Sequence, residues 1–296
     1  MKKPIQSKIE YILFLIFYHS TRIWPLPVIK FVAAQVMIFG GMVLGIRKHT
    51  AMKNLQMVYP DKSAKDRKKI LIGMYKEMGV SSAEVYFGDF NKLYEDVEVE
   101  GWENLEKAIA MDKGVIIASC HTGNWELAGR YINRRHKLSV IYKKLRNRYL
   151  NDFTYNMRDA EGLIMIEHKK ALRQIIKLLK EKYIVTIMID QNGRKNGVIT
   201  NFLGHPASTY VGTAKIAIKT QTPIVSAIAI RLPNGKHKFF FEEMILPEGY
   251  KNNLQDIKEL TERVSAQIEK YILQYPEQWF WVHRRWRGYK KARKAV

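Results

Sequence analysis

The chain contains little cysteine and few acidic residues. Its one cysteine, Cys120, excludes an internal disulfide framework and a metal site built from several thiolates, and it is typical of a reducing compartment. Only 28 aspartates and glutamates stand against 50 lysines and arginines, which gives a formal net charge of +22. This excess does not determine a fold. It does predict contact with polyanions: nucleic acid, anionic lipid, a phosphorylated glycolipid or an acidic carrier protein.

Several chemistries lack their sequence signatures. The chain contains no Walker A loop, no glycine fingerprint of a dinucleotide fold, no Gly-x-Ser-x-Gly elbow, no His-Glu-x-x-His and no Cys-x-x-Cys. Metal-dependent, nucleotide-dependent and acyl-serine mechanisms are therefore disfavoured, and we expect neither a metal nor a cofactor.

A histidine and a carboxylate stand where an apolar segment passes into a helical pattern, in the string His121-Thr-Gly-Asn-Trp-Glu126. Residues 114–120 are apolar and β-branched, which predicts a buried strand, and residues 124–135 carry apolar side chains at helical spacing. His121 is then expected at the carboxyl end of the strand and Glu126 in the first helical turn. In open α/β sheets, ligands bind at this edge.

This placement favours general-base chemistry. A carboxylate near a helix N-terminus stays ionised, so we expect Glu126 to hold the His121 ring in one tautomer and to stabilise its protonated form. The backbone N–H groups of Gly123 and Asn124 would face a developing oxyanion. The alternatives are a histidine satisfied within the core and an ordinary first-turn glutamate. Adjacent strand residues point to opposite faces, so we interpret Cys120 as a buried thiol and not as a nucleophile.

The string resembles that of the bacterial late acyltransferases of lipid A, which add a secondary lauroyl or myristoyl chain to the lipopolysaccharide precursor. The wider superfamily of lysophospholipid acyltransferases shares the pattern His-x-x-x-x-Asp/Glu. The resemblance continues in four further blocks in the same order: Val140-Ile-Tyr-Lys-Lys-Leu-Arg-Asn147, Met188-Ile-Asp-Gln-Asn-Gly193, Phe202-Leu-Gly-His-Pro-Ala207 and Tyr275-Pro-Glu-Gln-Trp-Phe-Trp-Val-His-Arg-Arg-Trp-Arg287. The chain departs from the family at two places, with Lys143-Lys144 for Arg-Pro and Ile189-Asp-Gln-Asn192 for Pro-Asp-Gln-Asp.

The resemblance implies transfer of a fatty acyl chain from an acyl-carrier-protein thioester to a hydroxyl of a lipid A precursor of the Kdo-lipid IVA type. His121 and Glu126 would act as the general-base pair, without a covalent acyl-enzyme. By the same resemblance, Asp190 aligns with a functional aspartate of the family. Arg158 lies where the family carries an arginine associated with anionic groups; a solvated surface arginine is the alternative.

Lys143, Arg146 and Arg148 belong to a run of eight basic residues, without an acid, between Leu127 and Asn151. Such a run is usually a solvated face. Because this run follows the histidine motif directly, we expect it to contact a phosphorylated acceptor or the acidic acyl carrier protein.

The last residues of the chain interleave aromatic and basic side chains. This composition is typical of proteins that contact membrane headgroups and of proteins that bind single-stranded nucleic acid.

Residues 11–46 carry only two charged side chains, Arg22 and Lys30. This predicts an N-terminal hydrophobic helical anchor within residues 1–50. Residues 25–46 approach the ~20 residues that cross a bilayer if Lys30 snorkels, and an interfacial helical hairpin fits equally well. The alternative is that this segment forms a pair of helices packed in the protein core. We expect a location at the bacterial inner membrane, with the catalytic domain facing the cytoplasm.

Behind this segment, short apolar runs alternate with helical patterns, which predicts an α/β fold with a mixed, largely parallel sheet flanked by helices. The family resemblance implies that this fold is like that of glycerolipid acyltransferases. One catalytic domain would span residues 51–296. We expect a capping box from Asp256 to Glu259 to open the last helix. Strands are expected at residues 114–120, 138–142, 163–166, 183–190, 223–230 and 239–246, and helices at residues 61–87, 124–135, 169–182, 212–220 and 256–274.

Other functions remain open. If the protein is an acyltransferase with another acceptor, this acceptor is a lysophospholipid or another glycolipid, since the histidine motif does not determine which acceptor is bound. In a thioesterase, His121 would activate water. A basic nucleic-acid-binding protein explains the charge but neither the apolar N-terminus nor the ordered motifs. The expected partners are therefore acyl carrier protein, a phosphorylated glycolipid and a membrane, and not nucleic acid.

Overall fold

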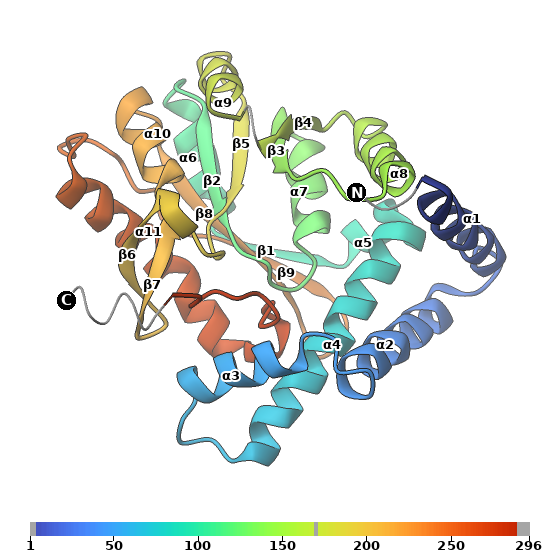
Figure 1. The fold of residues 1–296 in the computed structure, drawn as a ribbon. Helices are drawn as coiled ribbons and strands as arrows, with labels where there is room; N and C mark the ends of the chain where they lie inside the picture. Colours follow the sequence, from blue (N-terminus) through green and yellow to red (C-terminus); the bar gives the residue numbers. More distant parts are fainter. Residues whose placement is uncertain (1–3, 169–170, 289–296) are drawn as a thin grey trace.

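The computed structural model describes residues 4–168 and 171–288, and a seven-stranded sheet forms its centre (Figure 1). The strand order is β1-β9-β8-β2-β5-β3-β4, and each pairing is parallel except that of β8 with β9. The expected mixed, largely parallel sheet is confirmed. The strands of this sheet are β1 (Val97–Glu100), β2 (Val115–Ser119), β3 (Leu138–Tyr142), β4 (Ile164–Glu167), β5 (Ile184–Met188), β8 (Ile224–Arg231) and β9 (His237–Phe241). Strands β6 (Gly197–Phe202) and β7 (His205–Tyr210) form a separate antiparallel pair.

Helices cover both faces of this sheet. On β2, Ile117 packs with Leu127 of α7, whereas the next residue, Ala118, packs on the opposite side in the same cluster as Ile175 of α9, as the alternation of a strand requires. The helices are α1 (Pro4–Thr21), α2 (Leu26–Met42), α3 (Lys48–Val58), α4 (Ala64–Phe87), α5 (Phe90–Glu95), α6 (Trp102–Ala110), α7 (Trp125–Asn133), α8 (Arg148–Asp159), α9 (Ala171–Lys180), α10 (Gly212–Thr220) and α11 (Leu254–Gln274).

Three local expectations are corrected. Residues 97–100, which are not among the expected strands, form the edge strand β1, which pairs with β9. The strand expected to reach residue 246 ends at Phe241. The cap of α11 is Asn253, whose side chain accepts a hydrogen bond from the Asp256 N–H at 2.9 Å, so the capping box expected at Asp256 is wrong by three residues. Helix α3 and the hairpin β6-β7 were not expected from periodicity.

The N-terminal segment forms two helices. Helix α2 packs closely on α4, because a Cβ atom at Gly79 of α4 would lie 2.5 Å from the carbonyl oxygen of Ala33. Helix α1 lies along α8, where Tyr11 stacks on Tyr149 with ring centroids 5.6 Å apart (Figure 1). The boundary of a separate unit at residue 50 stays a prediction.

The expected spanning helix over residues 25–46 is corrected. Among the helices of the described residues, none combines the length and the apolar character that crossing a bilayer requires. Helix α2 has 17 residues and ends at Met42, where the chain begins to turn.

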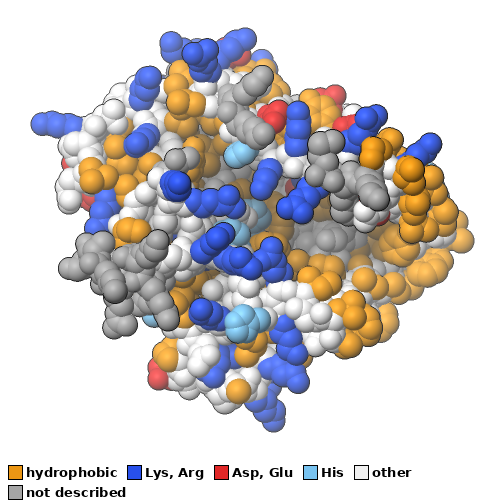
Figure 2. Space-filling model, viewed as in Figure 1, with side chains coloured by type: hydrophobic (Ala, Val, Ile, Leu, Met, Phe, Trp, Pro, Cys, Tyr) orange, Lys and Arg blue, Asp and Glu red, His pale blue; other side chains and the backbone are white. Residues whose placement is uncertain are grey.

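The outward faces of α1 and α2 carry exposed, large hydrophobic side chains, and Figure 2 shows this apolar surface on the side of the molecule where the two helices lie. We call it the N-terminal apolar surface. Its exposed members are Ile5, Ile9, Ile12, Leu13, Ile16, Phe17, Ile23, Trp24, Val28, Phe31, Val36 and Phe39.

A buried carboxylate on α4 connects this helix to the rest of the fold. Glu84 is fully buried, forms ion pairs with Lys30 of α2 (2.6 Å) and Arg231 of β8 (2.6 Å), and lies 3.2 Å from Nε2 of His237 of β9. Burial alone would raise the pKa of Glu84, but hydrogen bonds from His237 and Arg231 outweigh it and hold the pKa well below its usual range. Glu84 also accepts a hydrogen bond from Asn124 at 2.9 Å, which fixes the start of α7.

Candidate active site

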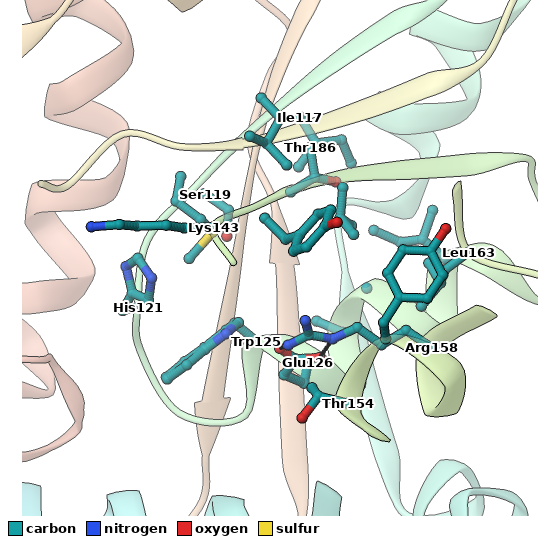
Figure 3. Close-up of a pocket in the computed structure, with 18 of the residues that line it drawn as sticks. Ile117, Ser119, His121, Trp125, Glu126, Lys143, Thr154, Arg158, Leu163 and Thr186 are labelled. Atoms are coloured by element: carbon teal, nitrogen blue, oxygen red, sulfur yellow. Dashed lines mark hydrogen bonds and ion pairs between the residues drawn. The ribbon is translucent and has the colours of Figure 1, made fainter. Parts of the chain in front are cut away.

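His121 lies directly beyond β2, in the loop that leads into α7 (Figure 3). Gly123 turns this loop with a φ of +48°, and a Cβ atom there would lie 2.6 Å from the carbonyl oxygen of Ala229. Its N–H donates to the carbonyl of Gln278 (3.2 Å), and its carbonyl accepts from the hydroxyl of Ser81 (3.2 Å). The loop is therefore fixed from the C-terminal segment on one side and from α4 on the other.

The hydrogen-bond partner of His121 is Asp190. Its Oδ1 lies 2.8 Å from Nδ1 of the ring, and its Oδ2 accepts from the backbone N–H of His121 at 3.0 Å and from the indole N–H of Trp279 at 2.8 Å. Asp190 is 2% exposed, so these contacts replace its lost hydration. When Nδ1–H donates to the carboxylate, the neutral ring keeps Nε2 as its proton acceptor.

His121 and Asp190 shift each other's pKa values. Burial would lower the pKa of His121, but the charge and hydrogen bond of Asp190 outweigh burial and raise the pKa above its ordinary value. Burial would likewise raise the pKa of Asp190, whereas the contacts with His121 and Trp279 hold it at about 2. The ionised carboxylate therefore stabilises the imidazolium that forms when the neutral ring accepts a proton.

Glu126 does not make the contact with His121 that we expected. Its carboxylate accepts hydrogen bonds from Arg158, with Nε at 3.1 Å, and from Arg130, with Nη1 at 3.2 Å. Burial would raise the pKa of Glu126, but the two guanidinium groups lower it. The ring of Trp125 packs against His121 on this side, with centroids 5.0 Å apart. The orienting contact is thus corrected to Asp190, and a catalytic role of Glu126 stays a prediction.

Gly123 and Asn124 position the loop. The N–H of Gly123 is already bonded to Gln278, so the expectation that it faces an oxyanion is wrong. The buried side chain of Asn124 caps α7 by accepting from the N–H of Leu127 at 3.0 Å. The backbone N–H of Asn124 stays the predicted oxyanion donor.

The basic run after the motif does not form one face. Arg130 is buried and lies 2.6 Å from the carboxylate of Glu161, whereas Lys143, Arg146 and Arg148 are exposed. Arg158 is paired with Glu126, so the alternative of a solvated surface arginine is wrong. Of the three exposed cations, Lys143 lines the pocket beside His121, and the predicted substrate contacts of all three remain predictions.

A pocket of about 370 Å³ lies beside His121, between the sheet and helices α7 and α8. Figure 3 shows His121 and Lys143 at one end of it and Leu163 at the other. We call it the apolar pocket, because its wall between these ends is formed largely by hydrophobic side chains and backbone: Ile117, Ala128, Gly129, Ile132, Val140, Met188 and Ala227. Such a cavity suits a hydrocarbon chain whose reactive end lies next to the histidine.

The motif did not reveal the contribution of the C-terminal segment. Trp279 holds Asp190, and Phe280 donates its N–H to the carbonyl of His121 at 3.2 Å with its ring 5.9 Å from the imidazole. The aromatic block ending in Arg287 was a signal, but nothing in it indicated contact with β2.

Cys120 is fully buried, and burial together with the charge of Asp190 raises the pKa of its thiol. This agrees with the interpretation of Cys120 as an inert side chain.

Replacing Asp190→Asn should lower the pKa of His121, because removal of the neighbouring negative charge favours the neutral ring. The pH at which the ring becomes protonated should therefore fall below that of the unchanged protein. Titration of the histidine ring signals by NMR measures this, with His121→Gln to assign the signal. Asp152→Asn, at an exposed carboxylate on α8, is the matched control and should leave the pKa unchanged. An equal His121 pKa in the Asp190 variant would contradict the pairing.

The family described as bacterial lipid A biosynthesis acyltransferase matches residues 2–288. The chain is 26% identical over 270 residues to a lipid A biosynthesis palmitoleoyltransferase of Escherichia coli K12, covering 89% of this chain and 86% of that protein. It is 24% identical to a lipid A biosynthesis lauroyltransferase of the same organism, over 79% and 77% of the two chains. A phosphatidylinositol mannoside acyltransferase of Mycobacterium tuberculosis is 22% identical, over 64% and 60%. The chain belongs to the family of bacterial lipid A biosynthesis acyltransferases.

Proposed function

We propose that this acyltransferase moves a fatty acyl chain from an acyl-carrier-protein thioester to a hydroxyl of a lipid A precursor of the Kdo-lipid IVA type. The observation that carries the proposal is a histidine with a carboxylate on Nδ1 at the end of an apolar pocket. The names of the relatives support the substrate class. The phosphatidylinositol mannoside relative favours another glycolipid as the second candidate acceptor. No further co-substrate or cofactor enters the proposal.

In the proposed reaction, Nε2 of His121 removes the proton of the acceptor hydroxyl as its oxygen attacks the thioester carbonyl. The C–O bond forms, and the carbonyl oxygen takes up the negative charge next to the N–H of Asn124. The oxyanion then collapses, the C–S bond breaks, and the carrier thiolate recovers the proton from His121. Asp190 stabilises the imidazolium in between, because its buried charge lies 2.8 Å from Nδ1.

The remaining site residues receive supporting roles in this proposal. Glu126 binds Arg158 and fixes its guanidinium at the pocket wall, where we propose that it contacts an anionic group of a substrate in addition to Glu126. Lys143, at the end of the pocket, and the exposed Arg146 and Arg148 attract the acidic carrier protein, so that its acyl chain enters the apolar pocket. Charge on a rim raises the rate of encounter more than the strength of the final complex.

The chemistry is tested with purified protein, acyl carrier protein thioester and lipid acceptor. His121→Ala should reduce acyl transfer by roughly 10²–10⁴-fold, the usual worth of general-base assistance. Asp190→Asn should lose more activity than Glu126→Gln, because Asp190 makes the contact with the ring. Mass spectrometry of the lipid product gives the rates, and denaturation curves establish that each variant folds.

Three results would contradict this scheme. Near-normal transfer by folded His121→Ala protein would remove the general base. A greater loss in Glu126→Gln than in Asp190→Asn would return the orienting role to Glu126. Release of free fatty acid at the same rate with and without the lipid acceptor would identify a thioesterase.

The apolar pocket should set the length of the acyl chain. Gly129 of α7 lines it, and a Cβ atom there would lie 3.8 Å from Leu138, an ordinary contact that the fold tolerates. Gly129→Leu would fill part of the pocket and shift the preference toward shorter chains. Each methylene excluded should cost about 0.8 kcal/mol, or roughly fourfold in kcat/KM.

Competition between thioesters of two chain lengths measures this preference directly. Gly129→Ala adds a single methyl group and should shift the preference less than Gly129→Leu. An unchanged chain-length preference in the folded Gly129→Leu protein would place the acyl chain outside this pocket.

We also propose that the N-terminal apolar surface rests in the inner membrane as an interfacial helical hairpin, at its cytoplasmic face. The support is its exposed hydrophobic side chains, among them Ile16 and Phe31, which are 61% and 65% exposed. The protein should bind vesicles of phosphatidylethanolamine and phosphatidylglycerol and resist washing in high salt, because salt screens charges but not hydrophobic contacts.

The double variant Ile16→Glu, Phe31→Glu should shift toward the supernatant when vesicles are sedimented at high salt. Leu254→Glu, at an equally exposed side chain on α11, is the matched control and should stay with the vesicles. Complete release of the unchanged protein by salt alone would contradict insertion of this surface.

A further inference from the structure

A second hollow lies on the other side of Phe280 from the apolar pocket. It has a volume of about 460 Å³, and α2, α4, the loop after β5 and the C-terminal segment enclose it. We call it the basic recess, because four arginines line it: Arg47, Arg194, Arg284 and Arg287. Phe280 lines this recess while its ring lies 5.9 Å from that of His121, which lines the apolar pocket. The two cavities therefore approach each other at the histidine.

The four arginines carry charge that the described part of the chain does not neutralise. All four are exposed, and no carboxylate within residues 4–168 and 171–288 forms an ion pair with any of them. Other arginines near the site differ: Arg158 and Arg231 are bound by glutamates. Figure 2 shows Lys and Arg side chains gathered around the histidines at the hollow centre of this face. Such a concentration of like charge in a recess predicts an anionic ligand.

The recess is built by specific contacts. The side chain of Asn192 donates to the carbonyls of Arg285 (2.7 Å) and Arg287 (3.2 Å) and accepts from the N–H of Arg194 (2.8 Å). One asparagine thus ties the loop that carries Arg194 to the C-terminal segment that carries Arg287.

The opposite wall of the recess is apolar. Met37 of α2 and Tyr75 and Met78 of α4 line it, next to the end of α2 where Phe39 is exposed. The recess therefore shares helix α2 with the N-terminal apolar surface, and it approaches His121 on its other side. A ligand that fits this arrangement combines hydrocarbon chains with a phosphate, which arginine recognises better than any other side chain does.

We propose that the basic recess binds the phosphate-bearing headgroup of the lipid acceptor, so that its hydroxyl reaches His121 from the side opposite the acyl chain. This assignment rests on the proposed acyl transfer and adds the site of the second substrate. A folded carrier protein is the competing anion, but a recess with an apolar wall fits a lipid better than a protein surface. The donor then occupies the apolar pocket and the acceptor the basic recess, with the imidazole between them.

Two-substrate kinetics test the assignment. The acceptor is used in two forms, a phosphorylated disaccharide lipid and its dephosphorylated counterpart, each in detergent micelles at saturating acyl carrier protein thioester. Arg284→Gln and Arg287→Gln should each raise the KM of the phosphorylated acceptor roughly tenfold, as expected for loss of one charge-assisted contact. The KM of the dephosphorylated acceptor should be nearly the same for the unchanged protein and for each variant, because the removed charges have no phosphate to bind.

Arg263→Gln, at an exposed arginine on α11, is the matched control and should change neither KM. Equal effects of Arg284→Gln and Arg287→Gln on both acceptor forms would overturn the assignment, as would unchanged acceptor KM values. A rise confined to the KM of the thioester would overturn it in favour of carrier docking. If the unchanged protein transfers no acyl group to either lipid, the proposed function itself fails, and that outcome is distinct from all of these.

Discussion

The buried carboxylate of Asp190 is the contact on which the geometry of the site depends. A charge at 2% exposure persists only when hydrogen bonds replace its hydration, and three donors do so: the ring and backbone of His121 and the indole of Trp279. These donors come from the end of β2 and from the C-terminal segment, while Asp190 follows β5. One electrostatic requirement therefore joins three distant parts of the chain and fixes the tautomer and direction of the imidazole.

A second buried carboxylate, that of Glu84, fixes the loop between His121 and α7 through its hydrogen bond with Asn124. It binds Lys30, Arg231 and His237 and reaches the cap of α7 through Asn124. Removal of one partner from such a cluster leaves an uncompensated charge, so α2, α4 and the sheet must stay together for the cluster to persist. The packing of the N-terminal helices is thereby coupled to the start of the helix that follows His121. The N-terminal helices and the candidate active site therefore share one electrostatic framework.

The sequence predicted local structure well and long-range contacts poorly. The strands of residues 114–120 and 138–142 and the helix after His121 were recognisable because periodicity and caps act within a few residues. Glu126 was chosen as the orienter because it is near in sequence, but the first turn of α7 directs it toward Arg130 and Arg158. Asp190 became the partner because β2 and β5 are neighbours with Ser119 opposite Met188, so the residues two positions beyond each strand meet. Strand adjacency is a property of the topology, which no local pattern contains.

The same distinction explains the distribution of charge. The excess of 22 positive charges was visible from composition, and the basic run between Leu127 and Asn151 was expected to contact a substrate because it follows the histidine motif. In the fold that run is divided: Arg130 is neutralised inside, whereas Lys143 borders the apolar pocket. Four arginines without carboxylate partners in the described chain come instead from three separate segments, which only the fold brings together around the basic recess. Hydrocarbon on one side of His121 and cations on the other suit a reaction between an acyl chain and an anionic lipid, and neither side is complete within any single stretch of sequence.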